Sequence, residues 1–334
     1  MSDLTLITGA SGFIGSHLTR ALLLRGDRVR ALAVDEAAAS AVRALGAETV
    51  VGNLLDRGSL ERAVAGASKV YHLAAQVRPG KSLDSLPGLS RAYHETNVVG
   101  TLNLVSACQK RIREFIFFSS IAAVGTGSDL DEDSPCRPTT DYGKSKREAE
   151  QALLDAFRRE RFPVKIIRPG QVYGPGNLPM RLFFKFVKHG FLPLVGSGDN
   201  HIPFCYVEDV VKAALLIEER GSVGEAYFAV GEPTTFRQFV QAIATAMGKA
   251  MPAFAVPAWA FRAGARAKDF VERAIGLRFF PLRLDFGVNA VAIAASEWSC
   301  RNRKIKEKLG FGAPAELAAC MDSTVRWYEA NRLI

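Results

Sequence analysis

The stretch LTLITGASGFIG, residues 4–15, decides the fold of this chain. Its first five residues are apolar or β-branched, which is typical of a short buried strand, and Gly9 ends the run. From Phe13 the apolar residues recur with helical periodicity as far as residue 25. A dinucleotide site needs a tight turn, backbone close enough to touch a pyrophosphate, and a helix packed tightly on the strand. Gly9, Gly12 and Gly15, placed between this strand and this helix, supply all three.

The same alternation continues along the chain. Further strands are expected at 29–34, 70–75, 115–120 and 164–169, with helices at 96–110 and 144–160. Strands that alternate with helices predict an α/β fold with a Rossmann-type, doubly wound parallel sheet. We expect an NAD(P)-binding domain over 1–170 and a smaller, mostly helical C-terminal substrate lobe over 171–334. A strand near 226–230 suggests that about 205–230 returns to the first domain.

Composition limits the class of protein. The 334 residues are 48% hydrophobic, enough for one large or two small cores. The five cysteines and five histidines show neither disulfide nor metal-ligand spacing, which favours a reducing compartment and disfavours a metalloenzyme. No apolar run approaches the roughly 20 residues of a membrane span, and the first residues lack the basic start of a signal peptide. We therefore expect a cytoplasmic protein.

The net charge of +9 is spread over the chain, with concentrations at 262–283 and 301–308. Solvated helix faces are the interpretation we favour. An acidic ligand or an anionic membrane surface, and so a peripheral membrane contact, are the alternatives. No nucleic-acid-binding motif accompanies the charge, so we expect no nucleic-acid partner.

The stretch DYGKSK, residues 141–146, places a tyrosine and a lysine on one helix face, because residues four apart are neighbours on a helix. A free tyrosine titrates near pKa ~10 and is a poor base at neutral pH. A nearby ammonium favours the phenolate, and lowering the pKa by about 3 units requires about 4 kcal/mol. Tyr142 with Lys146 is therefore either ordinary decoration of a helix surface or an acid/base pair that takes a proton from an alcohol or returns it to an alkoxide.

Taken in order, the glycine turn, YHLAA (71–75), FFSS (117–120) and YGKSK (142–146) resemble the extended short-chain dehydrogenase/reductase family. RPGQVYGPG (168–176), FCYVEDVVKA (204–213) and the segment 308–329 extend the resemblance over essentially the whole chain. The resemblance implies an enzyme that uses NAD, with NADP not excluded.

The family's catalytic triad matches Ser120, which would hold the substrate oxygen, Tyr142 and Lys146. Asn97 matches an asparagine that helps order the site. The cofactor-binding residues implied by the resemblance are Gly9, Ser11, Gly12, Phe13, Ile14, Gly15, Asp35, Asn53, Leu54, Leu73, Ala74, Ala75, Asn97, Tyr142, Lys146 and Pro169.

The choice between NAD and NADP rests on the end of the second strand. A carboxylate there binds the adenosine ribose, whereas an arginine favours a 2′-phosphate. Asp35 follows the last glycine by about 20 residues and favours NAD, unless it only caps the next helix. Relatives often carry an Asp-Leu or Asp-Ile pair at the adenine, where this chain has Asn53 and Leu54. Asp56 is expected to cap a helix.

The resemblance leaves several functions to compare. Dehydratases carry an Asp-Glu pair soon after the serine, but here no carboxylate occurs before Asp129. UDP-sugar 4-epimerases typically have an asparagine where this chain has Gln171, and an arginine where it has Ile202, although His201 or Arg181 are possible substitutes.

The stretch after Ser120 and an apolar second lobe, including 183–194 and 256–286, look more like the 3β-hydroxysteroid, sterol and dihydroflavonol-reductase-like branch. We therefore favour a dehydrogenase/reductase acting on a bulky apolar alcohol or ketone. The epimerase is the alternative, and a non-catalytic NAD(P)-binding regulator is the remote one. A homodimer through 96–110 and 144–160 is expected by family likeness.

Overall fold

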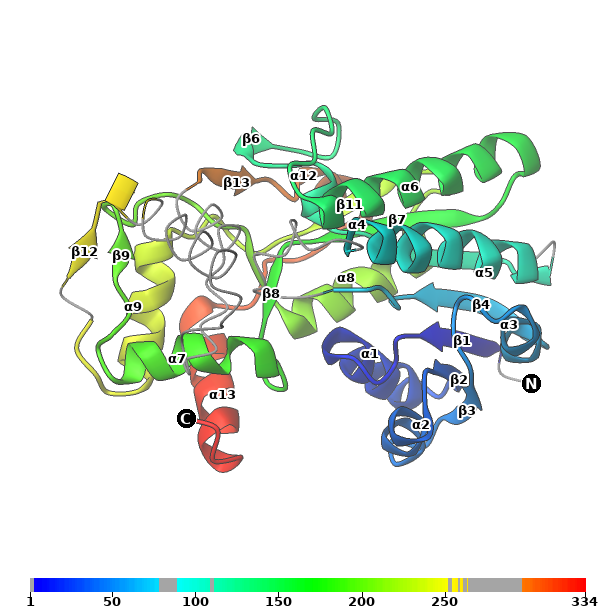
Figure 1. Ribbon diagram of the computed structural model, residues 1–334, viewed down its shortest axis with the longest axis horizontal. Coiled ribbons are helices and arrows are strands. Elements are labelled where there is room, and N and C mark those ends of the chain that lie inside the picture. The colour runs from blue at the N-terminus through cyan, green and yellow to red at the C-terminus, as the bar shows by residue number, and fades with distance from the viewer. Residues whose placement is uncertain are drawn as a thin grey trace, which may run out of the picture.

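The computed structural model describes residues 3–77, 89–108, 111–251, 254–257, 259–260, 263 and 296–334. A seven-stranded parallel sheet forms its centre, in the spatial order β11-β7-β5-β4-β1-β2-β3 (Figure 1). The strands are β1 (Leu4–Thr8), β2 (Arg28–Ala33), β3 (Glu48–Val51), β4 (Ala67–His72), β5 (Glu114–Phe118), β7 (Val164–Pro169) and β11 (Ala226–Ala229). The expected doubly wound parallel sheet is confirmed.

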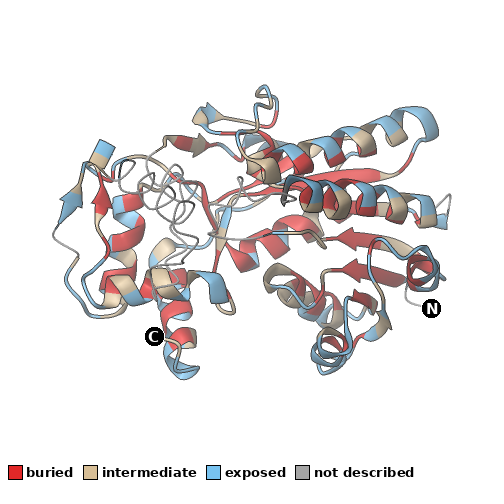
Figure 2. Cartoon of the chain, in the orientation of Figure 1, coloured by how far each residue is buried: buried red, intermediate tan, exposed pale blue. Residues whose placement is uncertain are grey.

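Helices cover both faces of this sheet, because side chains alternate between the two faces along each strand. On β5, Phe115 and Phe117 pack with α3 (Arg57–Val64), α5 (Gly100–Cys108) and α6 (Asp141–Glu160). Ile116 and Phe118 point the other way, toward a layer built from α1 (Phe13–Leu24), α2 (Glu36–Arg43), α8 (Val207–Arg220) and α12 (Arg303–Leu309). Figure 2 shows the buried strands between helices whose outer faces are exposed.

A second lobe lies beyond the ends toward which the arrows of β1 and β4 point in Figure 1. It contains α7 (Arg181–Lys188), α9 (Phe236–Ala246), α13 (Leu317–Ala330) and the paired strands β9 (Leu194–Val195) and β12 (Ala255–Val256). Its core is aromatic: the rings of Phe204 and Phe239 stack with centroids 3.6 Å apart.

Short elements connect the two parts. Strand β8 (Gln171–Tyr173) pairs with β10 (Phe204–Tyr206), and β6 (Gly127–Leu130) pairs with β13 (Trp298–Cys300). The remaining elements are α4 (Leu89–Tyr93), the π-helix η1 (His94–Val99) and the 3-10 turns η3 (Ile121–Ala123) and η4 (Leu178–Met180). Most of the apolar stretch 256–286 lies outside the described residues.

No helix within the described ranges is both long and apolar enough to cross a bilayer. Within the same ranges, no cluster of three His, Cys, Asp or Glu side chains has the arrangement of a metal site.

Candidate active site

The glycine turn joins β1 to α1, and each glycine meets backbone where a side chain would stand. Gly9 has φ +77°, and a Cβ there would lie 2.7 Å from the backbone nitrogen of Ala74. A Cβ at Gly15 would lie 2.0 Å from the Gly9 carbonyl oxygen. Helix α1 therefore packs directly on the turn, a close approach that only glycine permits.

The residues at this turn fit a dinucleotide phosphate. The N-cap of α1 is Gly12, which has no side chain to accept the first N–H groups, and the first turn carries no acidic residue. The amides of that turn, which include those of Phe13 and Ile14, are therefore left to an external acceptor. Ser11 is exposed beside them.

The loop after β4 is fixed against the same turn. The backbone nitrogen of Leu73 donates to the Thr8 carbonyl (3.0 Å), and that of Ala74 donates to the Thr8 hydroxyl (3.2 Å). Leu73, Ala74 and Ala75 are all partly buried. Because parallel strands end at one edge of the sheet, this loop and the glycine turn lie side by side at the edge where such sheets bind ligands.

The residues expected at the adenosine end are held by local hydrogen bonds. Asp35 caps α2, with its Oδ1 accepting from Ala38 N at 2.7 Å. Asn53 accepts from Leu55 N at 2.8 Å, and Leu54 is buried. Asp56 caps α3, as predicted. The capping role of Asp35 occupies one carboxylate oxygen, so its role toward a ribose stays a prediction.

Ser120 and Tyr142 lie close together because the 3-10 turn η3 packs tightly on the start of helix α6, where residue 143 is a glycine. Ser120 is the N-cap of η3 at the end of β5, and Thr140 caps α6 by accepting from Gly143 N (3.0 Å). A Cβ at Gly143 would lie 2.3 Å from the Ala122 carbonyl oxygen. This contact was not recognised from the sequence; the glycine inside YGKSK is its only local signal.

The Tyr142 phenol lies within hydrogen-bonding reach of Ser120. Burial and the neighbouring Tyr93 raise the pKa of Tyr142 to about 12, and the hydrogen bond with Ser120 lowers it only in part. The rings of Tyr93 and Tyr142 meet edge to face with centroids 6.0 Å apart. The lowered tyrosine pKa expected from the sequence is thus not reached by these side chains alone, because desolvation is the largest effect.

Lys146 lies one turn along α6 and is 2% exposed. Burial lowers the pKa of its ammonium to about 7, against the opposing charge of Glu150. Its Nζ lies 4.3 Å from the centre of the Phe117 ring. A lysine with this pKa changes charge near neutral pH, where an acid/base site has to operate.

Asn97 joins three segments of the site. It is 1% exposed, on the π-helix η1. Its Oδ1 accepts from Gln76 N (2.7 Å), and its Nδ2 donates to Ser145 Oγ (3.0 Å), which in turn donates to the Tyr142 carbonyl (2.8 Å). The asparagine therefore ties the loop after β4 to the first turn of α6.

A fully buried histidine, His72, is linked to Asn97 through Thr101. Its role was not recognised from the sequence. The Thr101 hydroxyl donates to the Asn97 carbonyl (2.6 Å), so it accepts from His72 Nε2–H (2.9 Å). His72 Nδ1 then accepts from the Thr8 hydroxyl (2.6 Å). Burial, together with Lys146, lowers the pKa of His72 to about 3, so the ring is neutral and its tautomer is fixed.

A buried ion pair supports the helix that carries Tyr142 and Lys146. Arg168 donates to both oxygens of Glu150 at 2.8 Å, and both side chains are buried. Burial alone would raise the pKa of Glu150, but Arg168 reverses this and holds it below the usual value. Pro169, expected near the cofactor, follows Arg168 at the end of β7 and is buried.

The side chains that distinguish the functional hypotheses lie in different surroundings. His201 pairs with Glu297 (3.0 Å), and Ile202 lies in the core of the second lobe. Gln171 and Arg181 are exposed. Asp129 is exposed on β6, where it pairs with Arg301.

Comparison with known proteins identifies the family. Residues 5–231 match the NAD dependent epimerase/dehydratase family. The chain is 30% identical to the sterol demethylase protein B of Methylococcus capsulatus, over 99% of each chain. It is 31% identical to the 4-hydroxy-2-methyl-3-oxo-4-farnesyl-3,4-dihydroquinoline-1-oxide ketoreductase of Stigmatella aurantiaca, over 92% of this chain and 91% of the relative.

A solved structure agrees with these relatives. The dTDP-glucose 4,6-dehydratase DesIV of Streptomyces venezuelae, determined with NAD bound, aligns with a TM-score of 0.77 at 25% identity over 98% of each chain. This chain belongs to the NAD dependent epimerase/dehydratase family and is an NAD-dependent oxidoreductase of the extended short-chain dehydrogenase/reductase type.

Proposed function

We propose that this enzyme interconverts a secondary alcohol and a ketone on a bulky, largely apolar substrate, with a 3β-hydroxysterol as the best single candidate. The observation that carries the proposal is the contact between Ser120 and the Tyr142 phenol, with Lys146 one helical turn away. A hydroxyl can hold an alcohol oxygen by a hydrogen bond, and a phenol beside a buried ammonium can take the proton from that oxygen or return it.

Each side chain has a distinct role in the proposal. Ser120 donates a hydrogen bond to the substrate oxygen, and Tyr142 exchanges the proton with that oxygen. Lys146, when charged, favours the phenolate, and Asn97 holds the first turn of α6 in place through Ser145. Bound NAD supplies the hydride acceptor and a cationic ring, which adds to the stabilisation that the phenolate needs.

The proposed cofactor contacts lie along the edge of the sheet where β1, β2 and β4 end. The glycine turn and the amides of Phe13 and Ile14 would hold the pyrophosphate. Asp35 would face the ribose, and Asn53 and Leu54 the adenine. Leu73, Ala74, Ala75 and Pro169 would line the walls.

The apolar substrate class is supported by two observations. The relatives with 30% and 31% identity are named for a sterol and for a farnesyl-bearing ketone. The position where epimerases typically carry an arginine is held by the buried Ile202, and His201 is engaged by Glu297. A diphosphate there would lack a bidentate cation.

We also propose the division into an NAD-binding domain, 1–170 with about 205–230, and a substrate lobe over the rest of 171–334. A homodimer through 96–110 and 144–160 is supported by the exposed Val99 and Leu102 near and on α5. Exposed apolar side chains on one helix suit a subunit contact.

The test is NADH formation by the purified protein with 3β-hydroxysterols, flavanols and UDP-sugars, with NAD and NADP in parallel and product analysis of each mixture. We expect net NADH with an apolar alcohol, and a loss of about 100-fold or more in kcat for Tyr142→Phe with NAD binding retained. Substantial turnover by Tyr142→Phe would refute the mechanism. A UDP-sugar converted without net NADH would establish the alternative epimerase.

A further inference from the structure

We infer that the outer edge of the second lobe is a docking surface for an anionic lipid bilayer. Three aromatic side chains there are exposed to solvent: Phe191 at 68%, Phe254 at 47% and Trp259 at 74%. Large aromatic rings are costly to leave in water. Isolated exposed apolar residues occur on most proteins, but three aromatics from one small substructure call for a partner.

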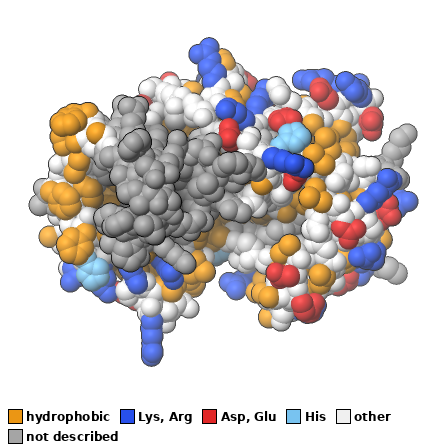
Figure 3. All heavy atoms as spheres, viewed as in Figure 1, with side chains coloured by type: hydrophobic (Ala, Val, Ile, Leu, Met, Phe, Trp, Pro, Cys, Tyr) orange, Lys and Arg blue, Asp and Glu red, His pale blue; other side chains and the backbone are white. Residues whose placement is uncertain are grey.

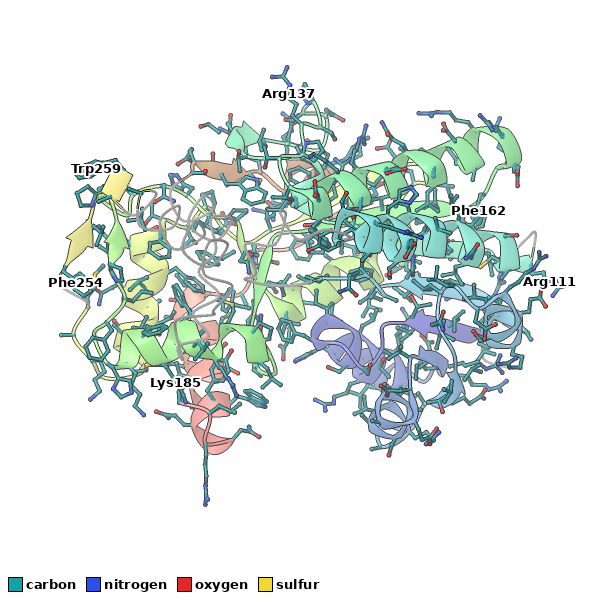
Figure 4. The ribbon with its side chains drawn as sticks, viewed as in Figure 1. Arg111, Arg137, Phe162, Lys185, Phe254 and Trp259 are labelled. Carbon is teal, nitrogen blue, oxygen red and sulfur yellow. The ribbon has the colours of Figure 1, made fainter. Side chains whose placement is uncertain are left out.

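All three rings come from segments that flank the paired strands β9 and β12. The Phe254 carbonyl accepts a hydrogen bond from Leu194 N (3.1 Å), the first residue of β9. Trp259 lies three residues after the end of β12. Phe191 lies between the end of α7 and the start of β9. Its ring stacks with the His189 ring, with centroids 6.4 Å apart. Figure 4 labels Phe254 and Trp259 on the left-hand edge of the lobe, and Figure 3 shows hydrophobic side chains gathered along that edge.

The segments that lead into these rings carry basic side chains. Helix α7 leads into Phe191 and presents Arg181 and Lys185 to solvent, with Lys188 partly exposed. Lys249 is exposed between α9 and β12. The sequence contains no Asp or Glu from 161 to 198 or from 233 to 268, and the first acidic side chain after β9, Asp199, pairs with Arg237. In Figure 3 no acidic side chain is visible along the same edge.

Aromatic rings among lysines favour a bilayer over a protein partner. Tryptophan and aromatic rings prefer the headgroup level of membranes, and each lysine near an anionic surface adds attraction. Protein interfaces are enriched in aromatics as well but depleted in lysine. The patch therefore matches an anionic membrane better than it matches a second copy of this chain.

This inference deepens the proposed function, because a bulky apolar alcohol partitions into membranes. A lobe that rests on the bilayer would take such a substrate from the surface where it is concentrated. The inference still fails independently of that function, since vesicle binding needs neither NAD nor turnover.

The experiment is co-sedimentation of the full chain with phosphatidylcholine vesicles, with and without 30% phosphatidylglycerol. We expect binding to the anionic vesicles that weakens as salt rises. Lys185→Glu with Lys188→Glu, and separately Phe254→Ser with Trp259→Ser, should each reduce binding by about ten-fold or more. The tryptophan emission of the wild type should shift to the blue on binding, and Trp259→Phe should lose that shift while still binding.

The matched controls lie on the NAD-binding domain. Arg20→Glu with Arg62→Glu makes the same charge change at exposed sites, and Leu24→Ser removes a side chain that is 83% exposed. Both should bind vesicles like the wild type, and thermal unfolding should show that every variant is folded.

Three outcomes would overturn the inference: no binding to anionic vesicles at low salt, equal losses in the control variants, or a lipid-free dimer that Phe254→Ser with Trp259→Ser converts to a monomer. The last would assign the surface to a second copy. Turnover of a 3β-hydroxysterol dispersed in detergent, without vesicles, tests the proposed function separately, since activity there without vesicle binding would overturn this inference alone.

Discussion

The ammonium of Lys146 lies over the face of the Phe117 ring, with Nζ 4.3 Å from its centre. Phe117 belongs to β5 and is fully buried, so the ammonium lies in a site where burial opposes its charge. The negative face of the ring offsets part of that opposition. Phe118, the next residue, points to the other face of the sheet and has no such role.

Replacing Phe117 with leucine should therefore lower the pKa of Lys146 below its value of about 7. A cation–π contact is worth about 0.5–2 kcal/mol, and one pKa unit is 1.36 kcal/mol, so a shift of roughly half a unit or more is expected. The alkaline limb of kcat/KM for NAD should move to lower pH by that amount. Phe118→Leu is the control. An alkaline limb of kcat/KM at the same pH in both variants would contradict the prediction.

Gly143→Ala should separate Tyr142 from Ser120 without unfolding the protein. The new Cβ would stand 2.3 Å from the Ala122 carbonyl oxygen, so the start of α6 has to move away from η3. Because misplacement by about 1 Å costs about 100-fold in rate, we expect kcat to fall by that order while NAD still binds. Isothermal titration with NAD and steady-state kinetics measure the two effects.

Gly58→Ala is the control for that substitution. Gly58 lies in the first turn of α3, where a Cβ would make an ordinary contact of 3.5 Å with Asp56. Its kinetics should match the wild type. A Gly143→Ala enzyme with unchanged kcat would show that the close packing of α6 on η3 does not position Tyr142.

Glu150→Gln should be strongly destabilising, because it leaves Arg168 as a buried cation without its partner. Breaking a buried pair from one side costs about 3–5 kcal/mol. Since the pKa of Glu150 is lowered in the fold, its stabilising effect is present above its unfolded pKa near 4.3 and is lost as pH falls through the lowered value. Urea unfolding at pH 7 measures the loss in the free energy of unfolding. Glu61→Gln, at the exposed Arg57–Glu61 pair, is the control and should lower that free energy by only about 0.5 kcal/mol. A similar change in both variants would contradict the prediction.

His72→Gln should make the protein less sensitive to acid. The pKa of His72 is about 3 in the fold, against 6.5 for a free histidine, so the unfolded chain binds one more proton in between. Wild-type stability should therefore fall as pH drops from 6.5 toward 3, and the variant should show a shallower slope. The slope is read from urea midpoints at pH 7, 6, 5 and 4.

The His72 variant should also be less stable at pH 7 by about 1–3 kcal/mol, because the hydroxyls of Thr8 and Thr101 lose a partner. An unchanged slope in His72→Gln would mean that the ring is not kept neutral in the fold.

The sequence by itself determined the parallel sheet, the place of the glycine turn and the order of the motifs. These features are local: five residues of β1 and the glycines at 9, 12 and 15 carry their turn chemistry within one short stretch. The same holds for the helix cap at Asp56, because a cap depends on residues two or three positions apart.

Only the tertiary structure decided the roles of His72, Gly143 and Glu150. His72 bonds to Thr8, 64 positions away, and Glu150 bonds to Arg168, 18 positions away, so no local periodicity predicts either contact. It also decided that burial outweighs the hydrogen bond at Tyr142, because desolvation depends on everything packed around a group and not on its neighbours in sequence. The exposed aromatic edge of the second lobe has the same origin, since exposure is a property of the folded surface.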